Sequence, residues 1–355
     1  MKRVFLFFSF LAVLVSCEKE RPGVKQSDDF KALMGENKSV WQHVETAEDY
    51  RNLEIFKALY EKNLAREVSK ESTLKIPKVI HFIWVGPNPF PKESVDNVRS
   101  WIEHHPGWTY KFWTDRKRPL PQKGMEFHLV SDFEFSALKE CFEDSDNYAE
   151  KSDLLRYEIL LKEGGLYVDH DVECFNSFDS FHHAYDFYCG LETPHTPILS
   201  SSISVCNNVI GARKGHPVFQ EAIQKITQCW EEIGTAYPGK DKDSIVYRVA
   251  QRTFATFDDA VREHTGKKGN RDIVFPAAYF NRIEQDPALY AHHYYASTWF
   301  EDETKFERNV RRRLISISKK NNQILLFNGA ILTANLALCV GLVVMYRSKK
   351  RKGEK

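Results

Sequence analysis

The 355-residue sequence lacks several features that would assign a protein to a simple functional class. Its formal net charge is only +1, so no overall positive field indicates a nucleic-acid partner. Its seven cysteines are scattered without a Cys-x-x-Cys pair, so neither a zinc site nor a disulfide framework is indicated. The chain has no internal repeat and no low-complexity tract. Because 42% of its residues are hydrophobic, it is able to bury one sizeable core.

Long hydrophobic runs are confined to the two ends of the chain. The N-terminal run, residues 4–15, follows two basic residues and precedes Ser16-Cys17. Residues 1–17 therefore have the layout of a signal peptide, and the run is too short to span a membrane comfortably. Residues 14–17 also resemble a bacterial lipobox, in which Cys17 would become the lipidated N-terminus. An uncleaved N-terminal anchor is the alternative.

The C-terminal run, residues 324–346, contains 23 residues without a charge and predicts a transmembrane helix. A basic juxtamembrane segment, residues 309–323, precedes it, and a basic tail, residues 347–355, follows it. Basic residues on both sides weaken the positive-inside rule, so orientation depends on the fate of the N-terminus. We expect a single-pass membrane protein, and export signals favour an exported or luminal domain.

Residues 76–308 have the pattern of an α/β domain, preceded by a charged helical stem over residues 18–75. A buried strand ends at Gly86-Pro87, a helix follows at residues 94–105, and a second strand follows at residues 109–115. This spacing opens a βαβ unit and predicts a mainly parallel sheet. Further elements are expected as strands at residues 125–130 and 185–191 and as an amphipathic helix at residues 217–233.

The most informative stretch runs from Ser152 to Phe175 and begins with a helical pattern. Ser152 is expected to cap a helix of about three turns, which stops at Gly164-Gly165. Asp153 and Arg156 lie three positions apart and so share one face of that helix. The alternative is a surface ion pair worth roughly 0.2–0.5 kcal/mol.

After the glycines, residues 166–175 alternate as one strand is expected to do. Asp169 and Asp171 would then point to the same side of the strand, where two carboxylates can converge on one hard divalent cation. Such a pair leaves most coordination positions open for phosphate oxygens. A solvated strand end is the alternative, because Asp-x-Asp is a common tripeptide.

The whole segment SDLLRYEILLKEGGLYVDHDVE closely resembles the DXD-containing sugar-binding region of glycosyltransferases. This family includes yeast-type initiating α-mannosyltransferases and, more distantly, the large clostridial glucosylating toxins. The resemblance implies the GT-A fold, a Rossmann-like nucleotide-sugar-binding domain with the DXD at the C-terminal end of a central strand. It implies that Asp169 and Asp171 hold Mn²⁺ or Mg²⁺, and that Asp153 and Arg156 bind sugar hydroxyls. His170 fills the variable position of the motif.

Two further segments extend the resemblance. IPKVIHFIWVG is similar to the family's first strand, which implies that Trp84 borders the nucleotide base and that His81 lines the same pocket. Asn208, in a segment resembling that before the family's late helix, would lie near the sugar or the acceptor. The alternatives are core positions for Trp84 and His81 and a satisfied turn position for Asn208.

YAHHYYASTW, residues 290–299, resembles the family's late motif that completes the metal and diphosphate site. His293 would be a third metal contact, and Trp299 would border the donor. Thr298 stands where serine is usual, whereas the register of the clostridial toxins selects Ser297. The alternative is an exposed, aromatic-rich loop.

Together these patterns predict a membrane-anchored, metal-dependent glycosyltransferase. It would move a hexosyl group from a UDP- or GDP-sugar to a glycan, lipid or protein acceptor, and the resemblance implies retention of anomeric configuration. No residue stands out as a covalent nucleophile, so front-face attack and double displacement both remain open. The alternatives are a catalytically inactive sugar- or nucleotide-binding membrane protein of the same fold and a metal-dependent phosphohydrolase that uses Asp169, Asp171 and His293.

Overall fold

The computed structural model describes residues 29–64, 73–267 and 269–296, together with Ile317 and Lys320. The described helices and strands belong to one compact unit, residues 27–315. The predicted signal peptide, most of the basic segment 309–323, the predicted transmembrane helix and the basic tail lie outside the described residues. None of the helices that the described residues form has the length and hydropathy needed to cross a membrane.

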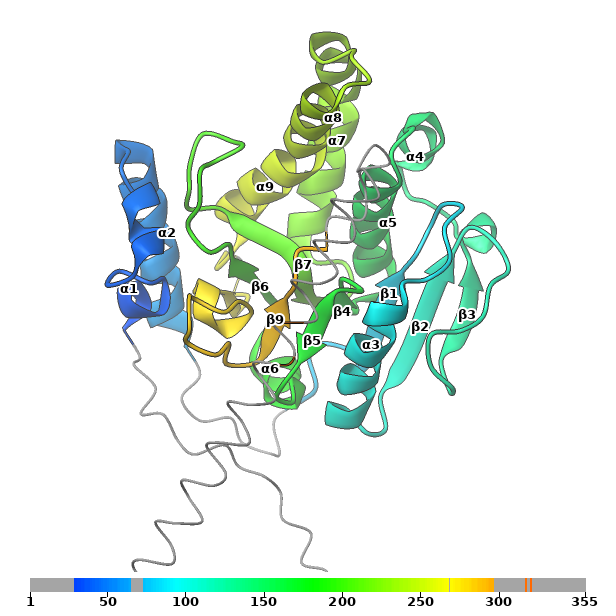
Figure 1. Ribbon diagram of the computed structural model, residues 1–355, viewed down its shortest axis with the longest axis horizontal. Helices are drawn as coiled ribbons and strands as arrows, with labels where there is room; N and C mark the ends of the chain where they lie inside the picture. The colour runs from blue at the N-terminus through cyan, green and yellow to red at the C-terminus, as the bar shows by residue number, and fades with distance from the viewer. Residues whose placement is uncertain (1–28, 65–72, 268, 297–316, 318–319, 321–355) are drawn as a thin grey trace, which may run out of the picture. The chain divides into compact units, whose positions relative to one another are not determined.

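The unit is built on a mixed sheet of seven strands in the order β3-β2-β1-β4-β7-β6-β8 (Figure 1). All of these strands run in one direction except β7, which is antiparallel to both β4 and β6. The predicted α/β domain with a mainly parallel sheet is therefore confirmed. The strands are β1 (Val79–Ile83), β2 (Thr109–Thr114), β3 (Glu126–Leu129), β4 (Gly165–Val168), β6 (Phe187–Leu191), β7 (Val205–Ala212) and β8 (Asp272–Phe275).

Helices cover the sheet, and a second, two-stranded sheet pairs β5 (Val172–Cys174) with β9 (Ala291–His293) (Figure 1). Helices α5 and α7 pack against each other, and α9 packs against α7 and β7. On another side, α3 packs against β5. The α-helices from this part are α3 (Lys92–His104), α4 (Lys139–Asp144), α5 (Tyr148–Glu163), α6 (Asp179–Ala184), α7 (Pro217–Ala236), α8 (Lys242–Val249) and α9 (Thr256–His264).

The described part of the predicted stem is helical and packs on the domain. Tyr60 contacts Tyr279 through their hydroxyls at 3.1 Å, and the Asn63 amide donates to the Asp272 carbonyl at 2.8 Å. Its elements are α1 (Phe30–Leu33), η1 (Ser39–His43) and α2 (Ala47–Asn63); the remaining short helices are η2 (Val130–Asp132), the π-helical η3 (Ala250–Ala255) and η4 (Ala277–Tyr279).

Helix α5 begins one turn earlier than the sequence predicted. Asn147, not Ser152, is its N-cap, and the Asn147 side chain accepts hydrogen bonds from the backbone of Ala149 and Glu150. Ser152 therefore lies inside the helix. The predicted stop is confirmed: Gly164 has φ +69°, and a Cβ there would lie 2.6 Å from the Lys214 nitrogen.

The predicted single strand over residues 166–175 is wrong. Strand β4 ends at Val168, and the chain then turns, with Val172 donating to the Asp169 carbonyl at 3.1 Å. Strand β5 leaves the large sheet to pair with β9, and the Trp101 indole holds its Val172 carbonyl at 2.9 Å. Asp169 and Asp171 thus lie on a turn at the carboxyl end of β4.

Candidate active site

The site lies at one edge of the large sheet. Strands β1, β4, β7 and β6 are consecutive there, and the carboxyl ends of β1, β4 and β6 meet the start of the antiparallel β7. A cavity of about 750 Å³ opens at this edge. Ligands bind outside the carboxyl ends of strands in sheets of this type, and the cavity therefore has the position of a substrate site.

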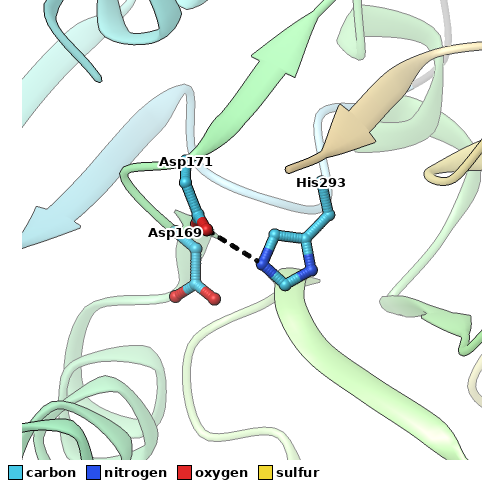
Figure 2. A group of neighbouring side chains, drawn as sticks. All are labelled: Asp169, Asp171 and His293. Atoms are coloured by element: carbon cyan, nitrogen blue, oxygen red, sulfur yellow. Dashed lines mark ion pairs between the residues drawn. The ribbon is translucent and has the colours of Figure 1, made fainter. Parts of the chain in front are cut away.

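Asp169, Asp171 and His293 meet in this cavity. Their possible ligand atoms, carboxylate oxygens and an imidazole nitrogen, all lie within 4.8 Å of one another. The pairing of β5 with β9 sets Val172 opposite His293 and so carries the histidine to the DXD turn. Figure 2 shows the His293 ring facing the Asp171 carboxylate, with 3.4 Å between Nε2 and the carboxylate oxygen.

The charges in this cluster balance each other within the protein. Burial favours neutral Asp171, but the neighbouring His293 and His170 and a hydrogen bond from the Ala296 amide hold the pKa of Asp171 well below its usual range. Burial also opposes charging of His293, yet Asp171 raises the pKa of His293 to about 9. The proton on His293 therefore offsets the carboxylate charge.

These residues fit a divalent cation. Two carboxylates and one imidazole are a donor set that Mn²⁺ accepts readily and that Mg²⁺ accepts less well at the nitrogen. Nδ1 of His293 is buried and has no hydrogen-bond partner among the described residues. Because a cation would replace the proton on His293 as the balancing charge, metal binding and deprotonation of this histidine are linked.

Arg156 connects Asp153, on the same helix α5, to the DXD turn. Its Nη2 lies 2.8 Å from Asp153 and 3.3 Å from Asp169, and its Nη1 donates to the Asn207 carbonyl at 2.6 Å. Its guanidinium lies over the Tyr167 ring, 4.2 Å from the ring centre. Arg156 and Asp153 are both buried, so the alternative of a surface ion pair is wrong. Most hydrogen-bond donors of Arg156 therefore hold Asp153, Asp169 and the Asn207 carbonyl in place.

Asp153 is held by a network that sequence reasoning missed. One of its carboxylate oxygens accepts from the Asn207 amide at 3.2 Å, and the other accepts from the Thr253 hydroxyl at 2.6 Å. Burial raises the pKa of Asp153 to about 6, although Arg156 acts in the opposite direction. Thr253 lies in η3, and no signal in the sequence connects it to Asp153.

A bulge in β7 holds the backbone of Asp169, while the Tyr167 hydroxyl of β4 donates to the Asp169 carboxylate at 2.6 Å. The pairing of β6 with β7 jumps from Cys189–Ile210 to Gly190–Cys206, which leaves Asn207, Asn208 and Val209 without partners on β6. The Asn208 carbonyl accepts from the Asp169 amide at 2.9 Å. The Asn208 side chain is buried, and its polar atoms have no partner within the described part of the chain. The neighbouring Asn207 is the one that lines the cavity.

The other predicted residues divide into two groups. Trp84 lines the cavity, with its ring 4.9 Å from that of His170 and its indole donating to the Asn88 carbonyl. His81, predicted in the nucleotide pocket, is instead fully buried in the core, where it lies 2.9 Å from the Gly164 carbonyl and accepts from the Trp113 indole. Burial lowers the pKa of His81 to about 4. Ser297 and Trp299 lie outside the described residues.

Part of the chain is similar in sequence to known glycosyltransferases. Residues 91–188 match the family model described as a glycosyltransferase sugar-binding region containing a DXD motif. The chain is 30% identical over 172 residues to the subversion of eukaryotic traffic protein A of Legionella pneumophila, which is 44% of this chain and 26% of that protein. It is 31% identical over 160 residues to inositol phosphoceramide mannosyltransferase 3 of Schizosaccharomyces pombe, which is 45% of this chain and 40% of that protein.

A longer match is to inositol phosphoceramide mannosyltransferase 1 of the same yeast, 26% identical over 284 residues, 79% of this chain and 76% of that protein. The first two matches span less than half the length of those relatives. The family match includes α5, β4 and the Asp169-His170-Asp171 turn. Residues 91–188 of this chain are therefore similar to the glycosyltransferase sugar-binding regions that contain a DXD motif.

Proposed function

We propose that this chain is a metal-dependent glycosyltransferase of the GT-A type that moves a hexosyl group from a UDP- or GDP-sugar to a hydroxyl acceptor on a glycan, lipid or protein. The observation that carries the proposal is the meeting of Asp169, Asp171 and His293 in the cavity, beside buried Arg156. Because two of the relatives are named mannosyltransferases, a mannosyl donor is the first to test.

The residues of the site have distinct tasks in such a reaction. Mn²⁺ or Mg²⁺, when bound, supplies a Lewis acid that offsets the charge developing on the departing diphosphate. Asp169 and Asp171 provide the oxygen ligands, and Arg156 fixes the orientation of Asp169. Asp153 presents a carboxylate at the cavity wall, where it can accept hydrogen bonds from sugar hydroxyls. The family resemblance supports retention of anomeric configuration.

The alternatives receive less support. An inactive sugar-binding protein has no need for a buried arginine that orients a metal-binding carboxylate. A phosphohydrolase needs more metal ligands than the three that the described residues bring together here. The predicted helix at residues 324–346 supports attachment to a membrane, and fractionation of the full-length protein with membranes tests this part of the proposal.

The deciding experiment measures nucleotide release by the full chain with UDP- and GDP-sugars, including a mannosyl donor. We expect release of one nucleotide that requires Mn²⁺ or Mg²⁺, increases with an acceptor and stops when the metal is chelated. Asp171→Asn is expected to lower turnover at least about 100-fold, because one removed electrostatic stabiliser costs that much in other enzymes.

Asp96→Asn is the matched control, because Asp96 is exposed on α3 and its carboxylate forms an ion pair with Arg99 at 2.8 Å. This variant is expected to retain full turnover. A folded sample that neither turns over nor binds any donor in the presence of metal would show the proposal to be wrong and favour the inactive sugar-binding protein.

A further inference from the structure

The cavity extends to both sides of the metal cluster. Across the sheet edge the order is β1, β4, β7 and β6, and β4 carries the DXD turn in the middle. On the β1 side the wall contains the aromatic rings of Trp84 and Tyr148. On the β6 side it contains Glu192 and much of the connection to β7, residues 193–204. A donor whose diphosphate lies at the cluster fills only one side and leaves the other for the acceptor.

The β6 side differs from the β1 side in chemistry. Residues 193–204, TPHTPILSSSIS, contain no phenylalanine, tyrosine or tryptophan, and their one side chain that can carry a charge is that of His195. Half of the side chains that they and η1 contribute to the cavity are aliphatic, namely Val40, Pro194, Pro197, Ile198 and Leu199, and the others are histidines or small hydroxyl-bearing side chains. Ile198 is 42% exposed. An exposed aliphatic wall that continues into a polar site marks a place for a ligand with an apolar part.

This wall is fixed by α2. Asp49, which is 1% exposed, accepts from the Ser201 hydroxyl and from the Ser202 amide, both at 2.7 Å. The Asn52 amide donates to the Ile203 carbonyl at 3.2 Å. The loop is therefore held in place before any ligand arrives, which reduces the cost of ordering it on binding.

Glu192 lies between the wall and the metal cluster. One of its carboxylate oxygens accepts from the Tyr295 hydroxyl at 2.7 Å, and the Tyr295 ring lies 4.1 Å from the His293 ring. Glu192 also lines the cavity. A carboxylate in this place can accept a hydrogen bond from an incoming hydroxyl and hold its oxygen near the cluster.

We infer that the β6 side of the cavity is the acceptor subsite, and that it takes an acceptor whose hydroxyl-bearing group carries an alkyl chain. This inference rests on the proposed function. The hydroxyl lies at Glu192 and the alkyl chain along the aliphatic wall. In the reaction, the acceptor oxygen bonds to the anomeric carbon, the bond from that carbon to the diphosphate oxygen breaks, and the hydroxyl proton ends on the diphosphate.

The test compares methyl, butyl and octyl mannosides and glucosides as acceptors for the full chain, with the donor that it turns over. We expect the acceptor KM to fall roughly tenfold or more from methyl to octyl, because each buried methylene strengthens binding severalfold. Ile198→Ser is expected to remove most of this gain without changing the donor KM. Ile55→Ser is the matched control, because Ile55 on α2 is also 42% exposed and does not line the cavity.

Equal KM values for methyl and octyl glycosides, or equal effects of the two serine variants, would overturn the inference while leaving the proposed function intact. If no glycoside is an acceptor, an octyl glycoside with a diazirine on its chain decides the matter. Photolabelling on η1 or residues 193–204 supports the subsite, and labelling elsewhere or none rejects it. Loss of metal-dependent donor binding would instead mean that the proposed function has failed.

Discussion

At Arg156, one guanidinium joins three separate parts of the chain: helix α5 through Asp153, the DXD turn through Asp169, and the β7 bulge through the Asn207 carbonyl. A planar group with several fixed donors can satisfy these partners together, whereas an ammonium is a single point charge. The spacing from Asp153 to Arg156 predicts that both lie on one face of a helix. The contact of Arg156 with the DXD turn depends on groups from β4 and β7, namely Tyr167 and the Asn207 carbonyl.

Arg156→Lys is expected to weaken Mn²⁺ binding about 10- to 100-fold, the usual effect of removing a group that orients a metal ligand. Calorimetric titration of the full chain with Mn²⁺ measures this change. Arg99→Lys is the matched control, because Arg99 forms an exposed pair with Asp96 at the same three-residue spacing. Unchanged Mn²⁺ affinity in folded Arg156→Lys protein would show that Arg156 does not orient Asp169.

Among the elements, the connection between β6 and β7 departs most from a simple hairpin. It leaves β6 beside the metal cluster, forms one wall of the cavity and returns through the bulge at Asn207–Val209. Helix α2 fixes it from the N-terminal part of the chain through Asp49. The stem thus contributes to the cavity, because Asp49 fixes one of the cavity's walls. The same aspartate also closes the capping box of α2 with Thr46.

Asp49→Ala is expected to lower the free energy of unfolding by about 2–4 kcal/mol, since it leaves several buried donors without partners. Amide exchange at Ser202 should also become faster. Urea unfolding and hydrogen exchange measure the two effects. Asp241→Ala is the control: Asp241 caps α8 at an exposed position, and its loss is expected to lower the free energy of unfolding clearly less than Asp49→Ala does. Equal losses in both variants would contradict a special role for Asp49.

For the molecule as a whole, buried histidines link stability to pH. His182 is fully buried, 3.1 Å from the Ile76 carbonyl and 3.0 Å from the Tyr188 hydroxyl. Burial, with a smaller contribution from His105, lowers the pKa of His182 to about 3. The unfolded chain takes up a proton near the ordinary histidine pKa, whereas the folded protein does not. The stability that neutral His182 provides is therefore present above about pH 6.5 and is lost as the pH falls toward 3.

We expect the stability difference between the wild type and His182→Gln to shrink by about 1.4 kcal/mol for each pH unit between 6 and 4. Urea unfolding of both proteins at pH 7 and pH 5 measures this difference. Taking the difference removes the contributions of the other titrating groups, since both proteins share them. A difference that stays constant over this range would contradict a depressed pKa for His182.

Sequence patterns predicted the parts of this protein that depend on short spacings. The βαβ pattern indicated the α/β domain, and the segment from Ser152 to Phe175 identified Asp153, Arg156, Asp169 and Asp171, which the structure brings together. His293 was predicted from a resemblance, and the pairing of β9 with β5 carries it to the cluster. The α/β pattern and the shared helix face of Asp153 and Arg156 could be predicted because helix faces and strand alternation are set by residues that are near one another in the chain.

Tertiary structure decided the features that depend on partners far away in the chain. Strand β4 ends at Val168 because the chain bends to bring Asp169 to the Asn208 carbonyl and Val172 to Trp101. His81 lies in the core because Gly164 and Trp113 surround it there. Asp153 gains Thr253, which lies 100 residues further along the chain. Spacing along the sequence cannot specify such contacts, since the partners approach only when separate elements pack.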